Sequence, residues 1–126
     1  MEKTNNLYDK AYAFAIKIIK VYQLLCKENK EMILSKQLMR AGTSIGANIS
    51  EANGGISKAD FSAKLSIAYK ECLETKYWLS LLKDTNYLTE ELFQNVYNDA
   101  DELGKILFSI LKTARIGNHN KIHAEC

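Results

Sequence analysis

The sequence of 126 residues contains no proline and only six glycines, four of which fall between positions 42 and 55. Because proline breaks helix interiors and marks turns, its absence favours a few long, uninterrupted helices. No apolar run approaches the ~20 residues that a membrane-spanning helix requires. The N-terminus also lacks the apolar core of a signal peptide. We therefore expect no membrane association and no secretion.

Cysteine is also scarce, and the three residues Cys26, Cys72 and Cys126 form neither a C-x-x-C pair nor an even set. Cys26 and Cys72 fall on apolar helical positions, where a free cysteine behaves as a small hydrophobic residue. This pattern predicts a reduced, cytoplasmic chain. The net charge of +2 is too small to indicate nucleic-acid binding by itself.

Apolar residues recur at helical spacing in four segments that short polar stretches separate. The segments predicted as helices are residues 7–27, 31–53, 58–84 and 90–116. Four amphipathic helices with short connections predict an all-α, antiparallel, up-down-up-down four-helix bundle. We expect residues 1–117 to form this single domain and residues 118–126 to form a flexible tail.

Capping residues are expected at the starts of the helices. Asn5 or Asn6 is predicted to cap the first helix, Ser57 the third and Thr89 the fourth. The second helix is expected to end at Gly54 and Gly55, and the fourth at Gly117. Each connection would then be a short, capped turn, as an antiparallel bundle requires.

Two of the predicted helices carry more apolar surface than one bundle face can bury. In segment 7–27 the apolar arc covers about 180°, whereas a surface helix needs only about 100°. Segment 58–84 is apolar on nearly all sides, which is typical of a helix covered by a second subunit. The candidate oligomer-interface residues are Ile16, Leu24, Ile67, Tyr77, Trp78 and Leu81.

A polar row runs beside the apolar seam of segment 31–53. A half-buried network that faces another helix and a ligand site both fit this row. Gly42 and Gly46 lie in the same segment, and each costs about 1 kcal/mol relative to alanine in a helix interior. We therefore expect a neighbouring helix to approach closely there. The residues predicted to form the polar network are Arg40, Ser44, Asn48, Glu51, Glu71 and Glu74.

Patterns of catalytic or metal-binding residues are weak. His119, His123 and Cys126 have a spacing that could in principle hold zinc, but chance histidines in a tail are the favoured interpretation. No Glu-x-x-His pair suits a di-iron bundle, and the glycines before Ile56 lack the G-x-x-x-x-G-K-S/T phosphate-binding motif. We expect no catalytic residue, no metal and no cofactor, and hence a protein that is not an enzyme.

Basic residues gather on the outer faces of the first and fourth predicted helices. The row on the fourth helix includes Phe108, and a basic row with an exposed aromatic residue suits a nucleic-acid backbone. A solvated lysine face is the alternative for a single chain, but oligomerisation would repeat each row and build a larger basic surface. The candidate nucleic-acid-binding residues are Lys10, Lys17, Lys20, Lys27, Lys105, Lys112 and Arg115.

Three motifs resemble those of a bacterial protein family. Residues 40–52, RAGTSIGANISEA, and residues 57–61, SKADF, resemble the patterns R-A-x-x-S-I-x-A-N-I-x-E-(G/A) and S-x-x-D-F. Residues 68–79, AYKECLETKYWL, resemble its E-x-x-E-(T/S)-x-Y-W-L pattern. These are the four-helix bundle proteins encoded in intervening sequences of large-subunit ribosomal RNA genes, and the resemblance covers residues 7–115.

The resemblance implies a left-handed bundle that assembles as a homopentamer and has no established catalytic activity. A related group, the accessory proteins of diversity-generating retroelements, binds reverse transcriptase and nucleic acid, so RNA, DNA or a ribonucleoprotein is the implied partner. One position departs from the pattern, since many members carry arginine where this chain has Ile56. A structural or protein–protein interaction module without nucleic-acid binding therefore stays open as the alternative function.

Overall fold

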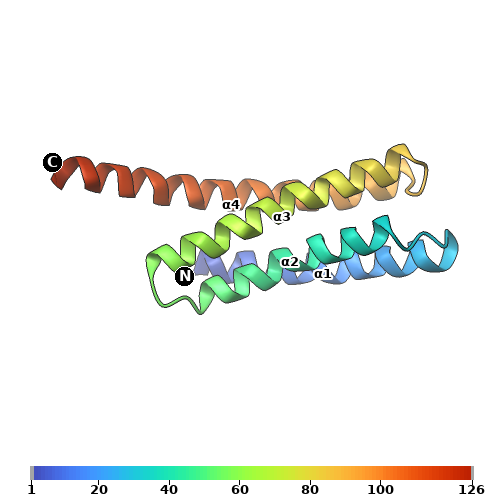
Figure 1. Ribbon diagram of the computed structural model, residues 1–126, viewed down its shortest axis with the longest axis horizontal. Coiled ribbons are helices and arrows are strands. Elements are labelled where there is room, and N and C mark those ends of the chain that lie inside the picture. Colours follow the sequence, from blue (N-terminus) through green and yellow to red (C-terminus); the bar gives the residue numbers. More distant parts are fainter. Residues whose placement is uncertain (1, 126) are drawn as a thin grey trace.

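The computed structural model describes the backbone of residues 2–125 and the side chains of residues 6–114. Its four helices are α1 (Glu2–Glu28), α2 (Leu34–Asn53), α3 (Lys58–Asp84) and α4 (Glu90–Glu125). Successive helices run antiparallel and are joined by short turns (Figure 1). Each helix packs against two others, so that α1 lies diagonally across from α3 and α2 from α4. The predicted all-α four-helix bundle is confirmed, while its left-handed twist stays a prediction.

The core is built from residues that recur every three or four positions along each helix. On α1 the buried seam is Leu7, Ala11, Phe14, Ile18, Val21 and Leu25. Fully burying a leucine, isoleucine or phenylalanine side chain stabilises a fold by about 1.5–3 kcal/mol. Residues of this spacing lie on one face of a helix, so the seams of all four helices meet in a single core. No helix among the described residues is long and apolar enough to cross a membrane.

Gly42 marks the closest approach between α1 and α2. A Cβ atom added there would lie 2.8 Å from Cγ1 of Ile18, which is closer than side chains tolerate. At Gly46 the added atom would lie 3.5 Å from the carbonyl oxygen of Ala11, an ordinary contact. The predicted close approach of a neighbouring helix is therefore confirmed, and Gly42 is the residue that requires it.

Helix α2 begins at Leu34, three residues later than expected, because Glu31 acts as its cap. The Glu31 carboxylate accepts hydrogen bonds from the backbone N–H groups of Ile33 (3.1 Å), Leu34 (2.9 Å) and Ser35 (2.7 Å). Burial raises the pKa of Glu31, but these donors outweigh burial and hold the pKa below its usual value. A buried carboxylate thus satisfies the N–H groups that an α-helix leaves unpaired at its start.

The other helix ends agree with the sequence in part. Ser57 Oγ accepts from the N–H of Asp60 (3.0 Å), and Thr89 Oγ1 accepts from the N–H of Leu92 (3.2 Å), which confirms both predicted caps. The predicted caps at Asn5 or Asn6 are wrong, because α1 begins at Glu2 and continues through both residues. Asparagine is tolerated inside a helix at a small cost.

The end of α4 also differs from the prediction. Its backbone continues through Gly117 to Glu125 instead of ending near Ile116. One glycine costs only about 1 kcal/mol in a helix interior, and no proline follows to stop the helix. The predicted flexible tail at residues 118–126 stays a prediction, because the side chains of these residues lie outside the described range.

Candidate nucleic-acid interface

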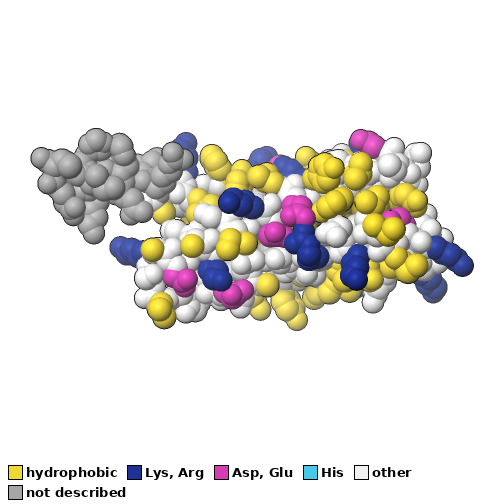
Figure 2. Space-filling model, in the orientation of Figure 1, with side chains coloured by type: hydrophobic (Ala, Val, Ile, Leu, Met, Phe, Trp, Pro, Cys, Tyr) yellow, Lys and Arg dark blue, Asp and Glu magenta, His cyan; other side chains and the backbone are white. Residues whose placement is uncertain are grey.

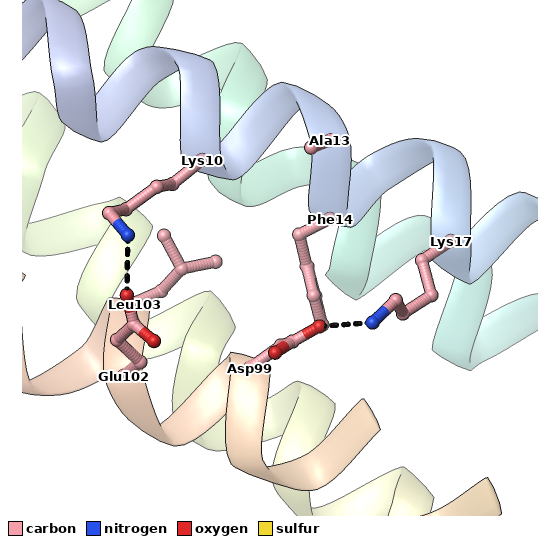
Figure 3. Close-up of a pocket in the computed structure, with 7 residues that line it drawn as sticks. All are labelled: Lys10, Ala13, Phe14, Lys17, Asp99, Glu102 and Leu103. Atoms are coloured by element: carbon pink, nitrogen blue, oxygen red, sulfur yellow. Dashed lines mark hydrogen bonds and ion pairs between the residues drawn. The ribbon is translucent and has the colours of Figure 1, made fainter. Parts of the chain in front are cut away.

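Two lysines of the candidate set on α1 are held in ion pairs with α4. Lys10 Nζ lies 2.7 Å from Glu102 Oε1, and Lys17 Nζ lies 2.5 Å from Asp99 Oδ2 (Figure 3). Lys17 also donates a hydrogen bond to Asn95 Oδ1 at 2.9 Å. The bond to Glu102 raises the pKa of Lys10. Both ammonium groups therefore already have an anionic partner within the chain.

These ion pairs flank a groove between α1 and α4, which we call the α1/α4 groove. It has a volume of about 230 Å³, with Phe14 and Leu103 among its lining residues. Helices α1 and α4 contact each other less than any other neighbouring pair. With two lysines and two carboxylates at its rims, the groove has no net charge.

The remaining lysines of the α1 row are differently placed. Lys20 and Lys27 are exposed, and neither has a carboxylate within salt-bridge distance among the described side chains. Lys27 lies in the last turn of α1, and Lys20 lies about two turns before it. They are therefore available to an anionic ligand, unlike Lys10 and Lys17.

The basic row of α4 lies beside α3. Lys105 Nζ is 3.0 Å from Asp101 Oδ2, while Lys76 of α3 approaches the other oxygen of the same carboxylate at 2.8 Å. Lys112 is exposed. The side chain of Arg115, the last predicted member, lies outside the described residues. One carboxylate therefore forms ion pairs with two lysines, so this side of α4 has a net positive charge.

The predicted polar network divides into three separate sets of contacts. In the first set, Arg40 of α2 pairs with Glu71 of α3 (Nη1 to Oε2, 3.2 Å) and with Glu74. Trp78 Nε1 donates a hydrogen bond to Glu74 Oε1 at 3.1 Å. Arg40 and its acids therefore join α2 to α3.

Of the other two sets, one lies within α2 and one joins α2 to α3. Asn48 Nδ2 donates to the carbonyl oxygen of Ser44 at 2.8 Å, within α2. Glu51 pairs with Lys64 of α3 at 3.1 Å. Among the described residues, no buried side-chain nitrogen or oxygen lacks a hydrogen-bond partner. The buried polar atoms of the row are thus paired inside the chain, while the side chains of Arg40 and Glu51 stay partly exposed.

Large apolar side chains remain exposed on α1 and on α3. Of the candidate interface residues, Ile16, Leu24, Ile67 and Tyr77 are exposed, whereas Trp78 and Leu81 are half-buried. Tyr12 is 58% exposed and Ile19 39%, although the sequence interpretation did not include them in the interface set. Their period of three to four residues was the signal that could have identified them.

Figure 2 shows hydrophobic side chains gathered over the second half of α3, with charged groups between them and the middle of the bundle.

The described residues include a buried cysteine and contain no cluster of metal ligands. Cys72 is buried between α3 and α4, and burial raises the pKa of its thiol to about 12. Such a thiol is unreactive at neutral pH. Residues 6–114 contain no group of three or more His, Cys, Asp or Glu side chains that could hold a metal ion. The side chains of His119, His123 and Cys126 lie outside this range.

Comparisons with known proteins agree with the motifs in the sequence. The profile of the 23S rRNA-intervening sequence protein family matches residues 3–109. A solved crystal structure from Bacteroides thetaiotaomicron, of a protein with unknown function from the S23 ribosomal protein family, is 50% identical to this chain. The similarity covers 87% of this chain and 98% of that one, with a TM-score of 0.86. No curated protein matches. The chain therefore belongs to the 23S rRNA-intervening sequence protein family.

Proposed function

We propose that this protein is a cytoplasmic, non-enzymatic accessory protein that assembles into a homo-oligomer and binds RNA. The observation that carries the proposal is the set of exposed lysines without a described carboxylate partner, which includes Lys20, Lys27 and Lys112. Lysines left in this state are the groups that contact a phosphate backbone. The family resemblance, which implies RNA, DNA or a ribonucleoprotein as the partner, is compatible with RNA as the nucleic acid.

The oligomer is supported by two different apolar patches. Tyr12, Ile16 and Ile19 lie on α1, whereas Ile67 and Tyr77 lie on α3, and these two helices are diagonal to each other. Contact between two different patches is heterologous, and repeated heterologous contacts form a ring when the rotation between neighbouring subunits closes. A ring is compatible with the homopentamer that the family resemblance implies. It would also repeat the lysine rows around the assembly and increase its local positive potential.

The assembly is tested by light scattering on the full chain and on two charge variants, Ile16→Glu and Tyr77→Glu. Both side chains are exposed in the single chain, so each variant should keep the helix content of the wild type. We expect an oligomer for the wild type and smaller species for both variants. Gln94→Glu, which adds the same charge to an exposed position of α4, is the matched control and should leave the assembly unchanged. A monomeric wild type would overturn this part of the proposal.

RNA binding is tested by fluorescence anisotropy with structured RNA at increasing salt. We expect an affinity that falls steeply with salt, because bound lysines release counterions from the RNA. The ion pairs of Lys10 and Lys17 favour the alternative function, a protein-interaction module, since they remove two lysines from the basic surface. Absence of RNA binding at low salt, with a protein partner recovered after nuclease treatment, would establish that alternative.

A further inference from the structure

A second groove lies between α3 and α4, which we call the α3/α4 groove. It has a volume of about 300 Å³, and Tyr69, Leu73 and Phe108 are the large apolar and aromatic side chains among its lining residues. This volume lies at the small end of the range for sites that hold small organic molecules. Gly104 lies opposite Cys72 on the floor, and its missing side chain leaves space there. The groove is therefore a mostly apolar hollow at the lower size limit for a small organic ligand.

The aromatic residues of the α3/α4 groove present an exposed face. Phe108 is 53% exposed, and its ring centroid lies 5.9 Å from that of Tyr69, with the rings tilted by 45°. Leu73 on α3 is also exposed. A half-exposed phenylalanine beside a second ring offers a platform on which a planar base can stack. Covering it would remove apolar surface from water, which favours binding.

The charge at the rims of this groove is positive. Lys76 and Lys105 share the single carboxylate of Asp101, so one of the two ammonium charges is unbalanced. Lys112 lies one turn beyond Phe108 on the same face of α4, and Lys70 follows Tyr69 on α3. Neither Lys70 nor Lys112 has a carboxylate within salt-bridge distance among the described side chains. The groove therefore combines an aromatic platform with an excess of lysines.

We propose that the α3/α4 groove binds an unpaired base of single-stranded RNA, with Phe108 stacking on the base and Lys105 and Lys112 contacting the neighbouring phosphates. The inference rests on the proposed RNA-binding function and names the form of RNA that this surface takes. In a duplex the bases are already stacked on one another, so their faces cannot reach Phe108. The groove should therefore distinguish single strands from duplexes, which lysines alone do not.

The test compares the binding of a short unstructured RNA and of a duplex RNA by the full chain at low salt. Phe108→Leu keeps an apolar side chain but removes the ring, and Phe108→Trp keeps a ring at the same exposed position. We expect Phe108→Leu to lower the affinity for single-stranded RNA about tenfold and to leave the affinity for duplex RNA unchanged. Phe108→Trp should restore binding to the wild-type level. A base analogue whose fluorescence is quenched on stacking should respond to the wild type and to Phe108→Trp, but not to Phe108→Leu.

The possible outcomes separate the inference from the function on which it rests. If the wild type binds both RNAs and Phe108→Leu binds them equally well, the inference is overturned while the RNA-binding function stands. The same holds if Phe108→Leu weakens single-stranded and duplex binding by the same factor. If the wild type binds neither RNA, both proposals fail.

Discussion

The two grooves that flank α4 are built from similar residues but differ in the balance of their charges. In the α1/α4 groove, Lys10 and Lys17 each have a carboxylate of their own, Glu102 and Asp99. In the α3/α4 groove, two lysines share one carboxylate, and further lysines lie beside an exposed phenylalanine. A lysine row on a helix therefore does not identify a binding surface until the acids of the neighbouring helix are known.

The largest expected effect is a loss of stability at high pH that Cys72 causes. This residue is buried at the floor of the α3/α4 groove. Burial raises the pKa of its thiol from 9.0 to about 12, so the folded chain binds the proton more tightly than the unfolded chain. Stability that is fully present below pH 9 should therefore be lost between pH 9 and pH 12, by an amount on the order of 4 kcal/mol. Urea unfolding at a series of pH values measures this loss.

Cys72→Ala removes the thiol, so the difference in pH slope between the two proteins isolates its contribution from those of lysines and tyrosines. The variant should lose less stability than the wild type across this range. Equal slopes would show that the floor of the groove is more hydrated than the packing around Cys72 implies.

A smaller effect, on the affinity for RNA, is expected when the carboxylates of the α1/α4 groove are removed. The groove then carries an excess of positive charge, as the α3/α4 groove does. Asp99→Asn combined with Glu102→Gln frees Lys10 and Lys17, so the affinity for RNA should rise about tenfold at low salt. The slope of log affinity against log salt should steepen by up to about 1.4, because each new phosphate contact contributes about 0.7 for single strands. Glu28→Gln combined with Glu91→Gln changes the net charge equally at exposed positions elsewhere and is the control. An equal gain from both pairs would mean that net charge, and not the groove, controls binding.

Two glycines should respond in opposite directions to the same substitution. Gly42→Ala would place Cβ 2.8 Å from Ile18, and overpacking of a core usually costs more than the helix gains from alanine. We expect a net loss of about 1 kcal/mol. Gly104→Ala meets Cys72 at an ordinary 3.8 Å, so the higher helix propensity should stabilise the fold by up to about 1 kcal/mol. Chemical denaturation of the two variants measures both changes, and a stabilising Gly42→Ala would contradict the close approach of α1 and α2.

The smallest effect is expected for Lys10→Gln, which breaks the exposed ion pair with Glu102. Ion pairs at the surface contribute little to stability because water and salt screen them. The melting temperature should therefore stay within the error of calorimetry, and the affinity for RNA should not change. A clear loss of RNA affinity would show that Lys10 contacts RNA in spite of its partner.

The fold could be predicted because it depends on patterns that are local in the sequence. The spacing of Leu65, Ala68 and Cys72 places them on one helix face wherever the helix lies. Ser57 and Thr89 act on N–H groups only three residues away. The cap at Glu31 was missed because a glutamate reaching forward to three N–H groups is not the usual capping pattern.

The candidate site could be predicted only in part, because its charges pair across long separations. Acidic residues at the start of a helix complement the helix dipole, but that effect fades within the first turn. Asp99 and Glu102 lie beyond that turn, and they bind Lys17 and Lys10, which are 82 and 92 residues away. The packing of the helices therefore decides which lysines are neutralised. Local sequence patterns do not show this packing.

The most direct test of the difference between the two grooves is the salt dependence of RNA binding by two matched double variants. Lys105→Gln with Lys112→Gln should weaken binding to single-stranded RNA and reduce the log–log salt slope by about 1.4, for two lost phosphate contacts. Lys10→Gln with Lys17→Gln removes the same charge and should leave both quantities near those of the wild type. Equal losses from the two variants would contradict the account, because they would show that RNA does not distinguish the α3/α4 groove from the α1/α4 groove.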